Sequence, residues 1–184
     1  ISTIAKPQPD GSFKLTGRKV YITDAQESDY MVLVTRTTPF ADVKRKTDGF
    51  TLFIVDTKAK GIEMHPIDVS IQMPEVQWQV FFDDVEIPET AMVGKEGEGF
   101  TKVMQGFDLS RFLIALMCIG TAQASVDETW QYLQDREAFG RPLAKFQGTT
   151  FPLAESDSKL AAVRALSYQG LALRDRGMPH TKEA

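Results

Sequence analysis

The sequence is 184 residues long, with 42% hydrophobic residues, 25% charged residues and a formal net charge of −4. This length allows one large domain or two small ones, and the composition is typical of a soluble globular protein. Residues 1–93 carry 10 basic and 14 acidic side chains, and residues 94–184 carry 11 of each. Neither part offers the basic surface of a nucleic-acid-binding protein. The most apolar stretch, residues 112–120, is too short and interrupted to span a bilayer, so no membrane partner is expected.

The first half of the chain is predicted to consist of strands joined by turns. Alternating or continuous apolar runs of strand length, several bounded by turn residues, support this prediction. The predicted strands are residues 13–16, 19–23, 30–36, 50–55, 62–65 and 78–82, the last ending at Asp83-Asp84. Regular strand spacing without helices between the strands favours an antiparallel sandwich or barrel, which we assign to residues 1–93.

The second half is predicted to be helical. Apolar residues recur at helical intervals from Phe100 to Trp130, and the Gly-Arg-Pro sequence that starts at Gly140 ends this helix. A second helix is predicted at about residues 146–176. The two helices form an antiparallel hairpin whose apolar faces need further partners, so residues 94–184 are predicted to be part of a four-helix bundle. The fold class is therefore α+β.

The usual catalytic and metal-binding patterns have little support in this sequence. The two histidines, His65 and His180, lie in different halves without a cluster of ligands, so neither a metal site nor a Ser-His-Asp triad is expected. Cys118 is the single cysteine, which suits a reducing compartment, and its apolar surroundings predict a small core residue. The glycines at 94, 97 and 99 alternate with glutamates that repel phosphate, so this segment is interpreted as a connector between strand and helix.

Three segments together form a more specific pattern. They are Gly-Arg-Lys-Val-Tyr-Ile-Thr-Asp-Ala at residues 17–25, the glycine-rich segment with Phe-Asp-Leu-Ser-Arg at residues 94–111, and Arg-Glu-Ala-Phe-Gly-Arg-Pro-Leu with Lys-Phe-Gln at residues 136–147. In this order, with strands giving way to helices, they resemble the acyl-CoA dehydrogenase family. The resemblance covers the family's middle β-domain and the start of its C-terminal helical domain. Ile1 begins within a strand-like run, so the numbering is expected to start inside a longer polypeptide.

The resemblance implies a homotetrameric FAD enzyme of fatty acid metabolism that oxidises an acyl-CoA thioester to the 2,3-enoyl-CoA. In this family a glutamate takes the α-proton, the β-hydride passes to flavin N5, and the electrons leave through an electron-transferring flavoprotein. The implied location is the cytoplasm of a bacterium or the mitochondrial matrix of a eukaryote. One subgroup places the glutamate where this chain has Ser110, so the base is expected beyond Ala184, and the chain alone is expected to be inactive.

The resemblance also assigns roles to individual residues. The strand Tyr21-Ile22-Thr23 lies against the flavin, with tyrosine where the family usually has tryptophan, and Asp24 replaces a commoner asparagine. Arg136 contacts the FAD pyrophosphate of a neighbouring subunit, because guanidinium can pair with phosphate oxygens. The other implied cofactor contacts are Phe139, Phe146 and Gln147. From the residues alone, an ordinary strand and a helix-end arginine would explain the same positions.

The implied acyl-CoA contacts are Phe107, Asp108 and Arg111. Asp108 and Arg111 are three residues apart and share a helix face, where a surface ion pair is the alternative interpretation. The apolar flanks Phe107 and Phe112 argue against a fully exposed site and favour the functional interpretation. A further departure is the stretch Gln72-Met73-Pro74-Glu75-Val76-Gln77-Trp78, where many relatives have Gly-x-Arg-x-Ser, and it suggests an altered acyl preference. The alternative functions are an acyl-CoA oxidase or flavin monooxygenase of the same fold, and a non-catalytic interaction module of strands and helices.

Overall fold

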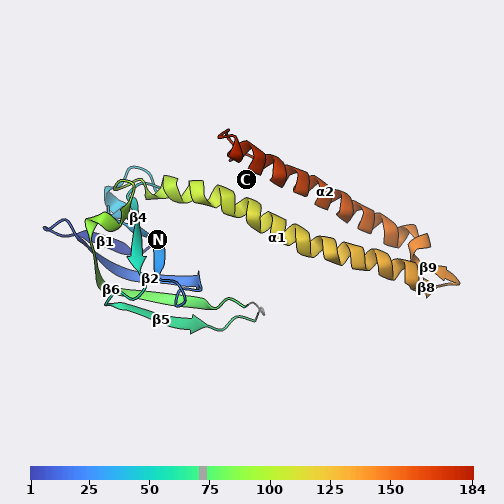
Figure 1. Ribbon diagram of the computed structural model, residues 1–184, viewed down its shortest axis with the longest axis horizontal. Coiled ribbons are helices and arrows are strands. Elements are labelled where there is room, and N and C mark those ends of the chain that lie inside the picture. The colour runs from blue at the N-terminus through green and yellow to red at the C-terminus, as the bar shows by residue number, and fades with distance from the viewer. Residues whose placement is uncertain (71–73) are drawn as a thin grey trace. The chain divides into compact units, whose positions relative to one another are not determined.

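The computed structural model describes residues 1–70 and 74–184, which form two compact units, Ile1–Met104 and Gln105–Ala184. The first unit contains one seven-stranded sheet and two short 3₁₀ turns (Figure 1). Its elements are β1 (Ile4–Pro7), β2 (Phe13–Thr23), β3 (Tyr30–Arg36), η1 (Phe40–Asp42), β4 (Phe50–Asp56), β5 (Ile62–Ile67), β6 (Gln77–Ile87), η2 (Glu89–Ala91) and β7 (Met92–Val93). The α+β fold class predicted from the sequence is confirmed.

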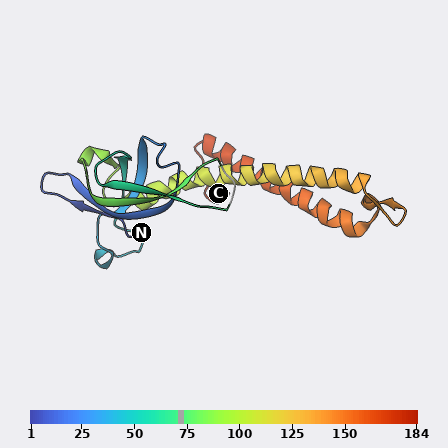
Figure 2. The ribbon, with the colours of Figure 1, turned by 90° about the horizontal axis from the view of Figure 1, so that it is seen from below.

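The sheet has the order β5-β6-β2-β1-β3-β4-β7. Its pairings are antiparallel except that of β1 with β3, which is parallel and joins Ile4 to Arg36, so the sheet is mixed. The twist of the strands is visible in Figure 2. Alternate side chains on the strands point to one face and form the core of this unit. Its buried members include Leu15, Phe53, Val80 and Val85, each fully shielded from solvent.

Strands β2 and β6 are much longer than the sequence pattern indicated. The expected break at Gly17 is a bulge inside β2, between Leu15 and Gly17, where the backbone of Gly17 has a φ of 141°. A Cβ at this position would lie 2.7 Å from Thr3 Cα, which accounts for glycine there. Strand β6 continues past Asp83-Asp84, because Val85 and Ile87 keep the apolar alternation and pair with Leu15 and Phe13.

The glycine-rich segment before the long helix serves as a structural connector. The amide of Gly97 donates to Thr51 Oγ1 at 3.0 Å, and Glu98 forms a bridge with Phe50 on β4. Gly99 is buried, and a Cβ there would lie 2.8 Å from backbone atoms of Phe50 and Thr51. Close packing against β4 therefore accounts for glycine at position 99 without a bound phosphate.

The second unit is an antiparallel helical hairpin with a small β-hairpin at its turn (Figure 1). Its elements are α1 (Gly99–Asp135, which begins in the first unit), β8 (Glu137–Ala138), β9 (Arg141–Pro142), η3 (Leu143–Lys145) and α2 (Gln147–Asp175). The two predicted helices are thereby confirmed. On α1 the buried apolar residues recur every seven positions, which places them on one face. They are Phe112, Ile119, Val126 and Leu133.

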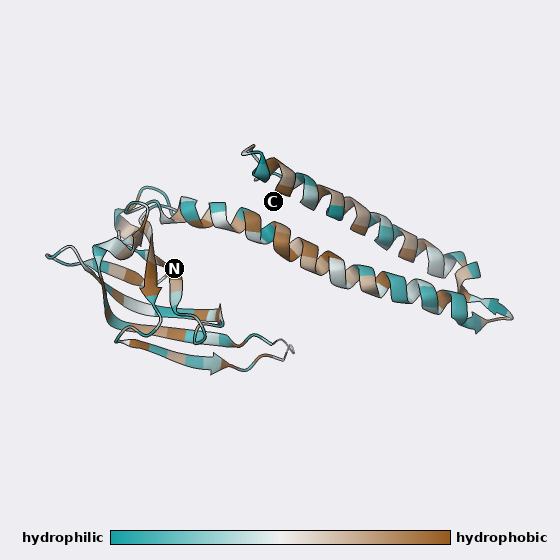
Figure 3. Cartoon of the chain, viewed as in Figure 1, coloured by the Kyte–Doolittle hydropathy of each residue, from teal (hydrophilic) through white to brown (hydrophobic). Residues whose placement is uncertain are grey.

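The helices are linked by a hydrogen bond from Arg164 Nη2 to Gln123 Oε1 at 2.9 Å. Apolar residues are concentrated in the middle of α1, and many of them are exposed (Figure 3). By length and composition α1 could also cross a membrane, in contrast to the expectation from residues 112–120. This is weak evidence, because a core helix of a soluble protein passes the same test.

Cys118 is exposed, so the prediction that it is a core residue was wrong. It directly precedes the buried Ile119, and adjacent helical residues point about 100° apart around the axis, so Cys118 lies at the edge of the buried face. The thiol lies beside an apolar hollow of about 650 Å³, lined by residues of both helices such as Ile119, Ala122 and Val163.

Candidate functional site

The residues predicted to face the flavin lie at the end of β2, in the first unit. Tyr21 sits in a bulge between Lys19 and Ile22, has a φ of 59° and exposes 66% of its surface. The hydroxyl of Thr23 is exposed and lies 3.1 Å from Nε2 and 3.2 Å from Oε1 of Gln77 on β6. A hydroxyl has one donor and two acceptor positions, so this pairing leaves hydrogen-bonding capacity for a ligand. The end of β2 therefore presents an exposed aromatic ring and an exposed hydroxyl two residues apart in the sequence.

The stretch that departs from the family pattern packs against this strand end. Gln72 and Met73 lie outside the described residues, whereas Pro74 to Trp78 are described. The amide of Val76 donates to Asp24 Oδ1 at 3.2 Å, and the amide of Asp24 donates to the Val76 carbonyl at 2.9 Å. An asparagine Oδ1 could accept the same bond, which explains how aspartate is accommodated where asparagine is commoner.

The other predicted cofactor residues gather at the turn of the helical hairpin. Arg136 follows the last residue of α1 and is exposed, and no described residue accepts a hydrogen bond from its guanidinium. The ring of Phe146 lies 6.2 Å from that of Phe139 and 4.2 Å from the guanidinium carbon of Arg141. Gln147 begins α2 and is also exposed. The predicted residues thus form one cluster, to which the structure adds Arg141 as a second cation.

Phe139 has an unusual conformation at the tip of this turn. It is 97% exposed, with a φ of 52°, and Gly140 follows with a φ of 76°. Two central residues with positive φ define a type I′ hairpin turn, in which asparagine or glycine is favoured and an aromatic residue is not. Within the described residues, the non-glycine residues with positive φ are Tyr21, Asp24, Asp84 and Phe139. Both aromatic residues in this group are predicted cofactor contacts, and strained backbone of this kind clusters at functional sites.

The predicted substrate residues lie near the start of the second unit. Arg111 Nη1 donates to Asp108 Oδ1 at 3.1 Å, and the side chain of Asp108 is 9% exposed, whereas that of Arg111 is 44% exposed. The interpretation as a simple surface ion pair is therefore wrong for Asp108, which is buried. Phe107, in contrast, is half exposed. Asp108 and the segment from Gly177 to Thr181 line a hollow of about 410 Å³.

The two groups in the second unit occupy opposite ends of the hairpin (Figure 1). Asp108 and Arg136 are separated by 28 positions along a helical run, which corresponds to about 42 Å at 1.5 Å per residue. Because of this separation, the Arg136 cluster and the Asp108–Arg111 pair form two distinct regions of the hairpin.

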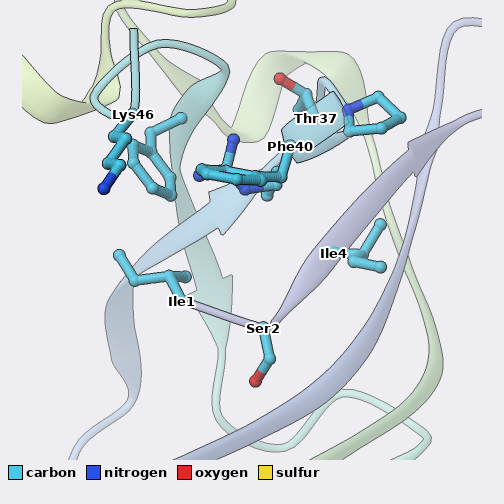
Figure 4. A pocket seen from close by; sticks show the side chains of 9 residues that line it. Ile1, Ser2, Ile4, Thr37, Phe40 and Lys46 are labelled. Carbon is cyan, nitrogen blue, oxygen red and sulfur yellow. The ribbon is translucent and has the colours of Figure 1, made fainter. Parts of the chain in front are cut away.

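A further hollow in the first unit was not anticipated from the sequence. It measures about 590 Å³ and lies between Ile1 and Ser2 on one side and Phe40 and Lys46 on the other (Figure 4). Arg36 at its wall is buried, with its guanidinium carbon 4.1 Å from the centre of the Phe50 ring. Its Nη1 donates to the carbonyls of Thr38 and Asp48, at 3.3 and 3.1 Å. Arg36 therefore closes the loop between β3 and β4, and no motif signalled this role.

Lys19 on β2 is a half-buried cation of the first unit. Its Nζ donates to the Val34 carbonyl at 2.6 Å, and desolvation lowers its pKa below the usual 10.5. Within residues 1–70 and 74–184 there is no group of three or more His, Cys, Asp and Glu side chains arranged to hold a metal ion.

Comparison with known proteins identifies the family. Residues 1–85 match the acyl-CoA dehydrogenase middle domain, and residues 97–184 match the acyl-CoA dehydrogenase C-terminal domain. The chain is 33% identical over 185 residues to a 3-(aryl)acrylate reductase of Clostridium sporogenes, covering 100% of this chain and 48% of the relative. It is 32% identical over 185 residues to the caffeyl-CoA reductase-Etf complex subunit CarC of Acetobacterium woodii, with the same coverage.

Among solved structures, the butyryl-CoA dehydrogenase of Megasphaera elsdenii is similar, with a TM-score of 0.88 and 30% identity over 99% of this chain and 47% of that one. The chain thus spans about half the length of the relatives that it matches. Because the two domain matches follow each other along the sequence and the fold agrees over nearly the whole chain, the protein belongs to the acyl-CoA dehydrogenase family, with a middle-domain sheet and C-terminal-domain helices.

Proposed function

We propose that this chain is part of an FAD-dependent acyl-CoA dehydrogenase that converts an acyl-CoA thioester to the 2,3-enoyl-CoA. The observation that carries the proposal is the match of two consecutive domains of one family to one continuous chain. In this reaction the substrate loses a proton from its α-carbon and a hydride from its β-carbon. FAD, when bound, supplies the acceptor for the hydride and its two electrons.

The first part of the proposal is that the exposed aromatic residues and Thr23 contact FAD. Tyr21 and Phe139 each combine large exposure with left-handed backbone. Contact with a bound FAD, which for Phe139 is the FAD of a neighbouring subunit, would offset this cost at each position. The Thr23 hydroxyl has capacity to bond a ring nitrogen beside its contact with Gln77. Ile22, which lies between Tyr21 and Thr23 on β2, is half-buried and keeps the strand in place.

The second part is that the turn of the hairpin binds the FAD pyrophosphate. The guanidinium of Arg141 lies over the ring of Phe146, and the exposed guanidinium of Arg136 at the same turn is suited to paired bonds with phosphate oxygens. Gln147 adds an exposed amide. The separation of about 42 Å along the hairpin favours the interpretation that this turn serves the FAD of a neighbouring subunit. We therefore propose a homo-oligomer, with a tetramer as the expected form.

The third part concerns acyl-CoA. The side chain of Arg111 is nearly half exposed, and one of its donor nitrogens is bound to the buried Asp108. This contact fixes the orientation of the guanidinium, whose other donors remain available to a ligand. We propose that Arg111, Asp108 and Phe107 lie along the pantetheine arm and orient the thioester. Correct placement of the reacting carbons is a large part of what an enzyme supplies in such a reaction.

The general base is proposed to come from outside this chain. Ser110 stands where one subgroup has glutamate, and its hydroxyl bonds the Gly106 carbonyl at 3.4 Å. A hydroxyl in this setting does not take up an α-proton at neutral pH, so the 184-residue chain alone should be inactive.

The proposed electron partner is an electron-transferring flavoprotein, in line with the name of the CarC relative. The relatives compared above are bacterial, and the proposed location is the cytoplasm, or the mitochondrial matrix in a eukaryote.

A second candidate function is the reverse reaction, the reduction of an enoyl thioester. Two of the compared relatives carry reductase names, one acting on aryl acrylates and one on caffeyl-CoA. The two directions use the same atoms and differ in the direction of hydride transfer, so the residues described above would serve either direction. The redox potentials of substrate and electron partner would then decide which direction prevails.

The test uses the full-length protein that contains this chain. We expect it to purify with bound FAD, and a series of acyl-CoA thioesters should bleach the flavin absorption band with formation of enoyl-CoA. Arg136→Ala should weaken the affinity for FAD by about one to two orders of magnitude, as expected for loss of a charged hydrogen bond. It should not change the preferred acyl chain. A protein without flavin, or a flavin that neither acyl-CoA nor enoyl-CoA affects, would overturn the proposal. Rapid reoxidation by oxygen would instead indicate the oxidase or monooxygenase alternative.

A further inference from the structure

The carboxylate of Asp108 is held by a second donor from a distant part of the chain. Thr181 Oγ1 donates to Asp108 Oδ2 at 2.8 Å, although the two residues are 73 positions apart. Arg111 Nη1 donates to the other oxygen, Oδ1, at 3.1 Å. Each carboxylate oxygen therefore has its own donor, one from the helix that carries Asp108 and one from the segment after α2.

This arrangement matters because Asp108 is buried. A buried carboxylate needs hydrogen-bond donors to remain charged, and charge-assisted bonds of this length are among the stronger ones in proteins. With only Arg111 as partner, the carboxylate could rotate about its χ2 torsion and take the guanidinium with it, because this terminal torsion is broad. The Thr181 hydroxyl removes that freedom by fixing Oδ2.

The segment that carries Thr181 is itself anchored to the hairpin. His180 Nδ1 lies 2.9 Å from the Met178 carbonyl, and the His180 ring lies 6.3 Å from the ring of the buried Phe112. Phe112 directly follows Arg111 on α1. The position of the Thr181 hydroxyl is thus tied to the same turn of α1 that carries the Asp108–Arg111 pair.

We propose that Thr181 is a positioning residue for acyl-CoA, because its hydroxyl orients Asp108 and, through Asp108, Arg111. The inference rests on the proposed function, in which Arg111 contacts the thioester arm. It adds a division of roles within the motif. Arg111 touches the substrate, Asp108 directs Arg111, and Thr181 directs Asp108. Neither the Asp-x-x-Arg spacing nor the sequence around Thr181 reveals this third partner.

The experiment compares hydroxyl-deleting and hydroxyl-keeping variants in the full-length holoenzyme. Thr181→Val should raise KM for acyl-CoA about tenfold, as expected for loss of one bond to a charged group, with a smaller change in kcat and unchanged flavin content. Thr181→Ser should restore the wild-type KM. Thr129→Val is the matched control, because among the described residues the exposed Thr129 hydroxyl bonds only the Ser125 carbonyl of its own helix.

A double-mutant cycle separates positioning from a purely structural role. If Thr181 acts through Arg111, adding Thr181→Val to Arg111→Ala should change KM little further. The inference would be overturned by a wild-type KM in Thr181→Val or by an equal rise of KM in Thr181→Ser. Additive effects of Thr181→Val and Arg111→Ala on KM would overturn it as well. Should the valine variant not fold, Thr181→Ala is compared with Thr181→Ser in the same way. Wild-type KM in Arg111→Ala would instead refute the proposed substrate site, which keeps the two failures distinguishable.

Discussion

Phe112 and Gly170 are in such close contact that no side chain fits between them. The ring of Phe112 on α1 is buried, and a Cβ on Gly170 of α2 would overlap its Cζ and Cε1 atoms. This contact holds the two helices together near the end of the hairpin that carries the Asp108–Arg111 pair. Gly170→Ala should therefore destabilise the protein by about 1–3 kcal/mol, the usual cost of overpacking a core. Thermal or denaturant unfolding measures the effect.

Gly120→Ala is the matched control for this prediction. Gly120 is an exposed position inside α1, and no described atom lies within 4 Å of a Cβ built there. Alanine should stabilise this helix by about 0.5–1 kcal/mol. Equal effects of the two substitutions would show that the Phe112–Gly170 contact does not limit the packing of the hairpin.

Phe139→Asn should separate the stability of the hairpin turn from cofactor binding. It creates an Asn-Gly pair, the favoured sequence of a type I′ turn, at a position where the phenylalanine has a φ of 52°. We expect a Tm equal to or above that of the wild type, and weaker FAD retention through loss of the exposed ring. Flavin content after gel filtration and a melting curve test both parts. Unchanged flavin content would remove Phe139 from the proposed cofactor site.

Thr23→Val should affect the reduction of the flavin more than its binding. The substitution keeps the branched shape and removes the hydroxyl, which leaves the side chain of Gln77 without its partner at the end of β2. Reduced flavin carries additional charge density, so loss of a hydrogen bond should lower its midpoint potential and slow the reductive half-reaction. Acyl-CoA affinity should change little. Stopped-flow reduction and redox titration are the measurements, and wild-type values in both would indicate that the segment is only a strand.

Lys19→Met should change the pH dependence of stability. Desolvation lowers the pKa of Lys19 below its usual 10.5, so between the two pKa values the unfolded chain binds more protons than the folded one. The contribution of Lys19 to the free energy of unfolding is therefore full above the usual pKa of lysine. It is lost as the pH falls through the lowered pKa of the folded state. The free energy of unfolding of the wild type should rise relative to that of Lys19→Met as the pH is raised from the lowered pKa towards 10.5. Parallel stability curves for the two proteins would contradict this expectation.

Much of the local structure follows from residue patterns. The second helix was predicted at about residues 146–176 and spans Gln147–Asp175, because its apolar spacing and the terminating Gly177 act over a few residues. The strands predicted at residues 30–36, 50–55 and 62–65 were found as β3, β4 and β5 for the same reason, whereas β1 was not predicted. The sequence pattern did not show that β2 continues through Gly17. The bulge there depends on Thr3, which lies next to Gly17 in space but is remote along the chain.

In the candidate site, too, some features follow from local sequence and others only from the folded structure. The family pattern named Tyr21, Phe139 and Arg111 because these residues belong to short motifs that can be recognised from the sequence alone. The sequence did not reveal that both aromatic residues adopt left-handed backbone, since φ at a bulge or a tight turn is set by the pairing of the strands around it.

The sequence by itself determined the α+β class, the helical hairpin and the family motifs, because periodicity and motif spacing are properties of neighbouring residues. Only the tertiary structure decided that Asp108 is buried, that Thr181 completes its hydrogen bonding and that Cys118 is exposed. Each of these depends on which distant segment packs against a given helix face. Burial and hydrogen bonding between such segments are set by the packing of the whole unit, and no local pattern encodes them.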